Sequence, residues 1–227
     1  MQSFVSHFFC ALLVFFCATA NAGGVALGST RMIYPSDAKQ ISLPITNSDE
    51  KTMFLVRSWV ADADGKKVSD FIVTPPLFVL NPQKESSLRV MFVGTQDPTI
   101  QQERVYYFHS QAIPSLPEEA KGKNTLQIAT KSVIKLFLRP TGLPFAAIDA
   151  PASLRCKKNS SSLIITNPSS YYVTMIELMV GGKKFNTVMV PPKSDTTIPA
   201  HGATGEVKFK TINDFGAHTP QQTCVIQ

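Results

Sequence analysis

The residue types that most often carry chemistry in proteins are few and widely spaced along this chain. Beyond residue 22 there are three histidines, His109, His201 and His218, and no two of them have the spacing of metal ligands. A copper or zinc centre on a β-sheet needs a cluster of imidazoles. The chain also lacks a glycine-rich phosphate loop and a G-x-S-x-G nucleophile motif. We therefore expect no metal, no other cofactor and no enzymatic activity.

The first 22 residues have the pattern of a secretory signal peptide. Their apolar run, Phe8 to Ala18, is too short to span a bilayer, which takes roughly 20 residues. The run is followed by Ala20-Asn21-Ala22, a small-x-small cleavage pattern, although no Lys or Arg precedes it. No other apolar stretch approaches membrane length. We expect an exported mature protein that starts near Gly23 and has no stable membrane insertion.

Two cysteines, Cys156 and Cys224, remain once Cys10 and Cys17 leave with this segment. In an exported chain two cysteines most simply form one disulfide. The alternative is a Cys–His catalytic or metal pair, but neither cysteine has a histidine neighbour or a C-x-x-C partner. Closing a loop of 224 − 156 = 68 residues stabilises a fold by roughly 4 kcal/mol in the chain-entropy model. The sequence favours a structural disulfide.

The composition of the 227 residues excludes further classes. With 22 Lys and Arg against 16 Asp and Glu the net charge is +6, and 44% of the residues are hydrophobic. That apolar content excludes an intrinsically disordered chain, and the length fits one large domain or two smaller ones. The positive charges are spread out, and Lys157-Lys158 and Lys183-Lys184 adjoin turns, which is typical of solvated loops. We expect no nucleic-acid partner.

Short runs of β-branched and aromatic residues between turn signals predict an all-β protein. Before a Pro/Gly-bearing stretch at 140–144 the predicted strands are 40–45, 53–60, 71–73, 77–80, 88–93, 105–108 and 126–138. After it they are 162–166, 171–180, 185–190, 205–212 and 224–226. About seven strands in about 115 residues are typical of an immunoglobulin-like sandwich. We expect two such domains, 23–140 and 141–227.

The segment from Leu126 to Pro140 is long for a strand of a small sandwich. Its apolar residues share one parity: Leu126, Ile128, Ile134, Leu136 and Leu138. One interpretation is an ordinary buried strand. The other is an edge strand that offers alternate side chains to another protein, the mode called β-augmentation. Periodicity alone does not decide between the two interpretations.

Five ordered motifs resemble the periplasmic pilus (fimbrial) assembly chaperones of the chaperone–usher pathway. They are Gly28 to Pro35, Thr74 to Leu80 with Leu88-Arg89-Val90, Glu103 to Phe108 with Ile113-Pro114, Leu126 to Ala129 with Ile134 to Pro140, and Ile212 to Gly216. The resemblance covers essentially the whole chain after the signal peptide. It implies two immunoglobulin-like domains arranged in an L, with a pilus subunit held along the first domain and in the cleft.

The resemblance also implies a function. Such a chaperone lends a strand to a subunit that lacks its last one (donor-strand complementation) and delivers the subunit to an outer-membrane usher. The partners would be pilus subunits and the usher, in the periplasm, and the free chaperone could also self-associate. The alternative is an exported structural pilus subunit or adhesin. That class carries an N-terminal donor extension, for which residues 23–28 are too short.

Site residues follow from the resemblance position by position. The pair that anchors the carboxylate of the subunit's last residue falls on Arg31 and Lys135, which without the resemblance would be taken for solvated surface charges. The donor side chains would be Leu126, Ile128 and Thr130, where the family usually has a larger aliphatic residue at the third position. A twist or bulge is expected between Leu126 and Leu136, because only the first part of the segment is the donor.

Three further residues, Glu103, Arg139 and Asp214, match a buried interdomain charge cluster of the family. His109-Ser110 departs from the family pattern, which has Asn and an aliphatic residue there. The short connection from Pro114 to Leu126 implies the short-loop subclass of these chaperones, which mostly serves rod-like pili.

Overall fold

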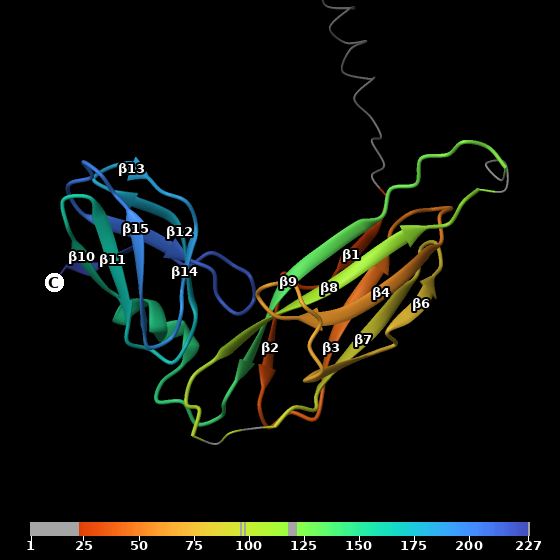
Figure 1. Cartoon of the computed structure of the whole chain (residues 1–227), viewed down its shortest axis with the longest axis horizontal. Coiled ribbons are helices and arrows are strands. Elements are labelled where there is room, and N and C mark those ends of the chain that lie inside the picture. Colours follow the sequence, from red (N-terminus) through yellow and green to blue (C-terminus); the bar gives the residue numbers. More distant parts are fainter. Residues whose placement is uncertain (1–22, 96, 98, 118–121, 227) are drawn as a thin grey trace, which may run out of the picture.

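The structure is a computed structural model and describes residues 23–95, 97, 99–117 and 122–226. The predicted signal peptide, residues 1–22, lies outside the described residues. No helix in the described part of the chain is long and apolar enough to cross a membrane. The described residues form two β-sandwiches joined at an angle, the arms of an L (Figure 1). The predicted all-β fold of two immunoglobulin-like sandwiches is confirmed.

The first sandwich consists of two sheets. Its strands are β1 (Val25–Leu27), β2 (Arg31–Pro35), β3 (Ile41–Asn47), β4 (Phe54–Ala61), β5 (Phe71–Thr74), β6 (Leu77–Leu80), β7 (Glu85–Phe92), β8 (Arg104–Pro114) and β9 (Thr130–Arg139). One sheet has the order β1-β3-β7-β5 and the other β2-β9-β8-β4-β6. Alternate side chains point between the sheets, as in β3, where Leu43 and Ile45 are buried. Tyr34, Phe108 and Leu136 fill the same core.

Residues 25–35 cross from one sheet to the other. β1 pairs with β3, whereas β2 runs parallel to β9 in the second sheet. Gly28 lies at the crossing and its N–H donates to the Pro44 carbonyl at 2.8 Å. A Cβ at Gly28 would lie 2.9 Å from the Cβ of Pro44, so the close approach needs glycine. The sequence pattern did not predict these two strands.

The second sandwich begins after a 3₁₀ helix, η2 (Ala147–Ser153). Its strands are β10 (Arg155–Lys158), β11 (Ser162–Asn167), β12 (Val173–Val180), β13 (Lys183–Lys184), β14 (Val188–Val190), β15 (Ser194–Pro199), β16 (Val207–Thr211), β17 (Gln222–Thr223) and β18 (Val225–Ile226). One sheet has the order β15-β11-β10-β18, and the other is built on β13-β12-β16-β17, with β14 also paired to β12. Strands β10 and β15 were not predicted, because polar residues dominate both.

The disulfide between Cys156 and Cys224 closes the second sandwich, as predicted. The two Cα atoms are 5.9 Å apart and both side chains are buried. Beside the bond, β10 pairs in parallel with β18, Arg155 opposite Val225. The last strand of the chain is therefore tied to the first strand of its domain by two hydrogen-bonding residue pairs and one covalent bond.

An arginine at the end of β9 joins the two sandwiches. Arg139 Nε lies 2.6 Å from Glu103 Oε1, and its two terminal nitrogens lie 2.7 and 2.8 Å from the carboxylate oxygens of Asp214. Glu103 also accepts the N–H of Tyr172 at 2.8 Å, so it too contacts the second sandwich. The structure thus brings together the three residues of the predicted interdomain cluster. Their control of the domain angle stays a prediction.

Aromatic contacts surround this cluster. Phe137 of β9 is buried, and its ring lies 5.8 Å from that of Tyr172. The guanidinium of Arg139 lies over the Tyr171 ring at 5.1 Å, and the Tyr171 hydroxyl donates to the Phe145 carbonyl. Removing a charge from water costs less free energy when the charge stacks on an aromatic ring and has its hydrogen bonds satisfied than when it is isolated. This interface fixes where the end of β9 lies relative to the second sandwich.

We expect the Cys156→Ala/Cys224→Ala double variant to lose about 4 kcal/mol of unfolding free energy in the second sandwich, because its unfolded chain is no longer cross-linked. Urea titration followed by far-ultraviolet circular dichroism measures the loss. The single tryptophan, Trp59, lies in β4, so its fluorescence transition serves as an internal control. A shift of the tryptophan transition as large as the other one would contradict the assignment of the bond to the second sandwich alone.

Arg139→Met should weaken the interface by about 3–5 kcal/mol, because Glu103 is left buried without its opposite charge. Burial already raises the pKa of Glu103, against the influence of Arg139 and of the Tyr172 N–H. Without Arg139 the pKa rises further, and the folded protein then holds this proton more tightly than the unfolded chain does. The loss of interface stability in Arg139→Met is therefore smallest at low pH, where Glu103 is protonated in both states. It grows as the pH rises through the raised pKa of Glu103.

Small-angle X-ray scattering across a pH series measures the effect of Arg139→Met as a wider spread of domain angles. The matched control is Arg89→Met, which removes an exposed arginine of β7. Equal scattering of the variant and the control at high pH would refute the role of the cluster.

Candidate functional site

Strand β9 is a buried strand in one half and an edge strand in the other, so each interpretation of the sequence applies to part of it. On one side it pairs with β8 along its whole length, from Thr130 opposite Ala112 to Leu138 opposite Arg104. On the other side β2 covers only Lys135–Arg139. Among the described residues no strand pairs with the free side of 130–134. The second half of β9 is thus an ordinary core strand, and the first half is an open edge with unused N–H and C=O groups.

The predicted start of this strand, at 126, is wrong: β9 starts at Thr130. Continuing the register would place Ile128 opposite Pro114, which has no N–H to extend the ladder. The Gln127 side chain instead donates to the Pro114 carbonyl. The paired part, from Thr130 to Leu138, contains no bulge, because its register has no shift; the predicted twist stays a prediction.

All three predicted donor side chains are exposed to water. Leu126 is 84% exposed and Ile128 is 68% exposed, and Thr130 is exposed at the start of β9. Burying a large aliphatic side chain stabilises by about 1.5–3 kcal/mol, so leaving two of them in water forgoes that energy. Exposed aliphatic residues next to an unpaired strand edge are typical of a protein-binding site.

The two predicted anchoring residues lie directly opposite each other. Arg31 is the first residue of β2, and the parallel register sets it beside Lys135. Burial lowers the pKa of Lys135, and the nearby charge of Arg31 lowers it further. Among the described residues Lys135 has no hydrogen-bond or ion-pair partner. The pair therefore places two partly buried positive charges at the inner end of the open edge.

Arg31 is oriented by the second sandwich. One terminal nitrogen donates to the Ile212 carbonyl at 3.2 Å, and the guanidinium lies 6.0 Å from the Phe137 ring centre. Its Nε atom is buried and has no hydrogen-bond partner among the described residues. Burial lowers the pKa of Arg31, while the charges of Asp214 and Glu103 act in the opposite direction.

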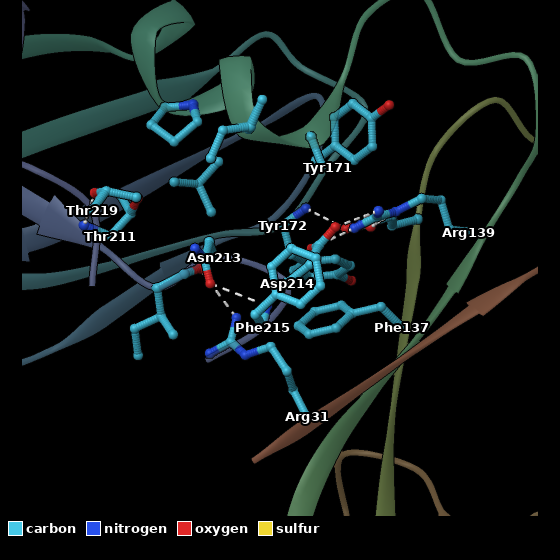
Figure 2. A pocket seen from close by; sticks show the side chains of 16 residues that line it. Arg31, Phe137, Arg139, Tyr171, Tyr172, Thr211, Asn213, Asp214, Phe215 and Thr219 are labelled. Atoms are coloured by element: carbon cyan, nitrogen blue, oxygen red, sulfur yellow. Dashed lines mark hydrogen bonds and ion pairs between the residues drawn. The ribbon is translucent and has the colours of Figure 1, made fainter. Parts of the chain in front are cut away.

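The arrangement is suited to a carboxylate. An anion between Arg31 and Lys135 would relieve the repulsion of two like charges and accept charge-assisted hydrogen bonds from both. Arg31 also faces a cavity of about 170 Å³ between the two sandwiches (Figure 2). Phe137, Tyr172, Ile212 and Asp214 line the same cavity. No group of three His, Cys, Asp or Glu side chains in the described part of the chain could hold a metal ion.

His109, one of the departures noted in the sequence, is buried on the outer side of the β8–β9 sheet. Its ring stacks on that of Trp59, with 5.1 Å between centres and 17° between planes, and Val133 lies opposite it in β9. Neither ring nitrogen has a hydrogen-bond partner among the described residues. Burial lowers the pKa of His109, with a smaller contribution from Lys131. A neutral, stacked imidazole is therefore compatible with this sheet.

Sequence reasoning missed one residue of this region, Phe215. It lines the cavity with Arg31 and is almost fully exposed. Its motif, Ile212 to Gly216, was noted only for Asp214. A large aromatic residue between an Asp and a Gly in a turn was the available signal, because turns seldom need an apolar side chain.

The comparisons with known proteins agree over nearly the whole chain. Residues 24–144 match the family described as "Pili and flagellar-assembly chaperone, PapD N-terminal domain", and residues 149–223 match "Pili assembly chaperone PapD, C-terminal domain". The probable fimbrial chaperone protein ElfD of Escherichia coli O157:H7 is 43% identical over 208 residues, 90% of this chain and 88% of that protein. The chaperone protein FocC of Escherichia coli is 39% identical, with 96% of each chain covered.

Solved structures of similar proteins have the same fold. The periplasmic chaperone SfaE superimposes with a TM-score of 0.78 at 37% identity, covering 90% of this chain and all of that one. A Salmonella enterica complex of the SafA pilin with the SafB chaperone matches with a TM-score of 0.80 at 29% identity, covering 91% and 98% of the two chains. This chain is a member of the PapD-like family of pilus-assembly chaperones.

Proposed function

We propose that the protein is a non-catalytic periplasmic chaperone that lends the β9 edge to pilus subunits, completes their fold and delivers them to an outer-membrane usher. The observation that carries the proposal is an open strand edge that ends at two partly buried cations, Arg31 and Lys135. Strand pairing supplies affinity through main-chain hydrogen bonds, and the exposed aliphatic residues supply contacts to the partner.

The geometry of β2 defines how a subunit strand would lie. The β9 edge is free over 130–134 and occupied by β2 from Lys135 onward. A guest strand therefore has to stop where β2 begins. If its last residue stops there, its carboxylate reaches Arg31 and Lys135, and the guest strand runs parallel to β9. Fixing the end of the guest strand also fixes its register, which main-chain hydrogen bonds alone would not do.

The exposed side chains supply the second half of the interaction. Leu126 and Ile128 would enter the groove that a subunit leaves open where its own last strand is missing, followed by Thr130. Residues 126–129, which are outside the ladder of the free protein, would extend β9 when a guest strand offers the hydrogen bonds that Pro114 cannot. Thr130 fills a groove less fully than a larger aliphatic side chain, so its contribution is the smallest of the three.

The matched chaperone SafB is found in complex with a pilin, which supports subunits as the partner class. The alternative, a structural pilus subunit or adhesin, is not favoured, because both halves of the chain match chaperone domains. The usher, the periplasmic location, the short-loop subclass and self-association of the free protein rest on the family resemblance. In self-association, a second copy would cover the edge that a subunit otherwise occupies.

Arg31→Ala and Lys135→Ala should each fold normally and bind a subunit about 10- to 100-fold more weakly, because each loses a charge-assisted hydrogen bond to the carboxylate, worth about 1.5–3 kcal/mol. The measurement is co-purification of a co-expressed pilin and its protection from protease. Arg89→Ala, at an exposed arginine of β7, is the matched control. Full protection by both cleft variants would refute the anchoring role.

Ile128→Glu should reduce the yield of the chaperone–subunit complex at least ten-fold, because the change places a charge in an apolar groove. Ile72→Glu is the control, since Ile72 is also exposed but lies on β5 of the opposite sheet. Both variants should melt like the wild type, because both side chains project into water. Equal complex yields from the two variants would count against the β9 edge as the donor.

A further inference from the structure

Phe215 is the most exposed large hydrophobic residue in the described part of the chain, at 94%. The ring is on a turn that is closed by hydrogen bonds. The Asn213 side-chain oxygen accepts the N–H groups of Phe215 at 3.1 Å and Ala217 at 2.9 Å. The N–H of Gly216 donates to the Asn213 carbonyl at 3.0 Å. Three hydrogen bonds thus hold the turn that presents the ring.

The same turn is fixed to the first sandwich. Asp214 bonds both terminal nitrogens of Arg139. Gly216 has a φ of +83°, and a Cβ there would lie 2.2 Å from the hydroxyl of Thr30, the residue before Arg31. The turn therefore packs directly against the start of β2. Phe215 is held at the cleft by both its neighbours in the chain, and its position relative to Arg31 does not depend on a flexible loop.

An apolar wall lies in the same cavity. Ile148 of η2 is 60% exposed and lines the cavity together with Phe215, Phe137 and Val173. Figure 2 shows Phe215 and Phe137 among the side chains that line the cavity with Arg31. The cavity volume of about 170 Å³ is close to that of apolar cavities of ~150 Å³ that hold benzene. An aromatic or large aliphatic side chain therefore fits in the cavity beside Arg31.

We propose that Phe215 and Ile148 form a specificity pocket for an apolar or aromatic side chain in the last two residues of the bound subunit. The inference rests on the proposed function, because the carboxylate held by Arg31 and Lys135 brings the end of the guest strand to this cavity. The chemistry of the occupant follows from the site: one end is cationic and takes the carboxylate, and the neighbouring wall is apolar. A subunit whose last two residues are small or charged would leave the apolar side chains of Phe215 and Ile148 exposed to water.

Short synthetic peptides test the pocket without a known subunit. They alternate valine and serine, are acetylated at the amino end, and carry phenylalanine at the last position, at the second-last position, or at neither, with alanine in its place. Each is made with a free carboxylate and with a carboxamide. Binding to the full mature chain is measured by isothermal titration calorimetry for the wild type, Phe215→Ser, Ile148→Ser and the control Leu77→Ser. Leu77 is exposed on β6, remote from the cavity residues in the fold.

The wild type and Leu77→Ser should bind one of the two phenylalanine peptides, with the ring at the last or at the second-last position, about ten-fold more tightly than the alanine peptide. Phe215→Ser should reduce that ratio to near one, and Ile148→Ser should reduce it in part. The melting temperature of Phe215→Ser should equal that of the wild type, because the ring is almost wholly in water.

The outcomes separate the two proposals. If the free carboxylate improves binding but the phenylalanine ratio is the same in Phe215→Ser as in the wild type, the pocket is wrong and the anchoring stands. If the carboxamide peptides bind the wild type as tightly as the carboxylates, the anchoring itself fails. Absence of binding by every peptide counts against both.

Discussion

Residues 25–35 divide their hydrogen bonds between the two sheets of the first sandwich, and the rest of the molecule depends on this division. β1 closes one sheet against β3, and after Gly28 the chain pairs with β9 in the other sheet. Because β2 begins only at Arg31, it covers the inner part of β9 and leaves 130–134 free. One crossing of the chain thus creates the open edge, fixes its length and places a cation at its end.

β9 links this edge to the second sandwich. Along one strand, the chain passes from the exposed Thr130 through Lys135 to Arg139, which bonds Glu103 and Asp214. Lys135, Phe137 and Arg139 lie on the same side of the sheet because side chains alternate. That side faces the cleft, while Leu136 and Leu138 fill the core. The alternation of a single strand therefore serves both the stability of the first sandwich and the assembly of the cleft.

The fold class could be predicted because alternation is a local signal. The run around Leu43 and Ile45 alternates strictly, and it forms a strand with the predicted inward face. β2 was not predicted from its pattern: its burial alternates, but Met32, Ile33 and Tyr34 are apolar in succession, so the sequence itself shows no alternation. The strand start at Leu126 was predicted wrongly for a non-local reason: the residue that would pair with Ile128 is Pro114, and only the three-dimensional register reveals it.

The site was less accessible to sequence reasoning than the fold. An isolated Arg31 or Lys135 has no local feature that distinguishes it from a surface charge, and only the resemblance singled the two residues out. Their direct opposition is a property of the β2–β9 register, which joins positions far apart in the chain. Phe215 was missed because its importance lies in exposure next to Arg31, and exposure of one residue in a turn cannot be read from its neighbours.

The beginning of β2 at Arg31 has a consequence for how the edge avoids indiscriminate pairing. An exposed strand edge normally pairs with any extended chain and promotes aggregation. Here a chain that continues past Lys135 meets β2, which already holds the hydrogen bonds of Lys135–Arg139. The interior of an unfolded polypeptide has no terminal carboxylate, so it has to turn away at that boundary and would leave Arg31 and Lys135 without a counter-charge. If a carboxylate binds at Arg31 and Lys135 as proposed, the edge would favour chain ends over chain interiors, and this preference would limit aggregation while the edge is uncovered.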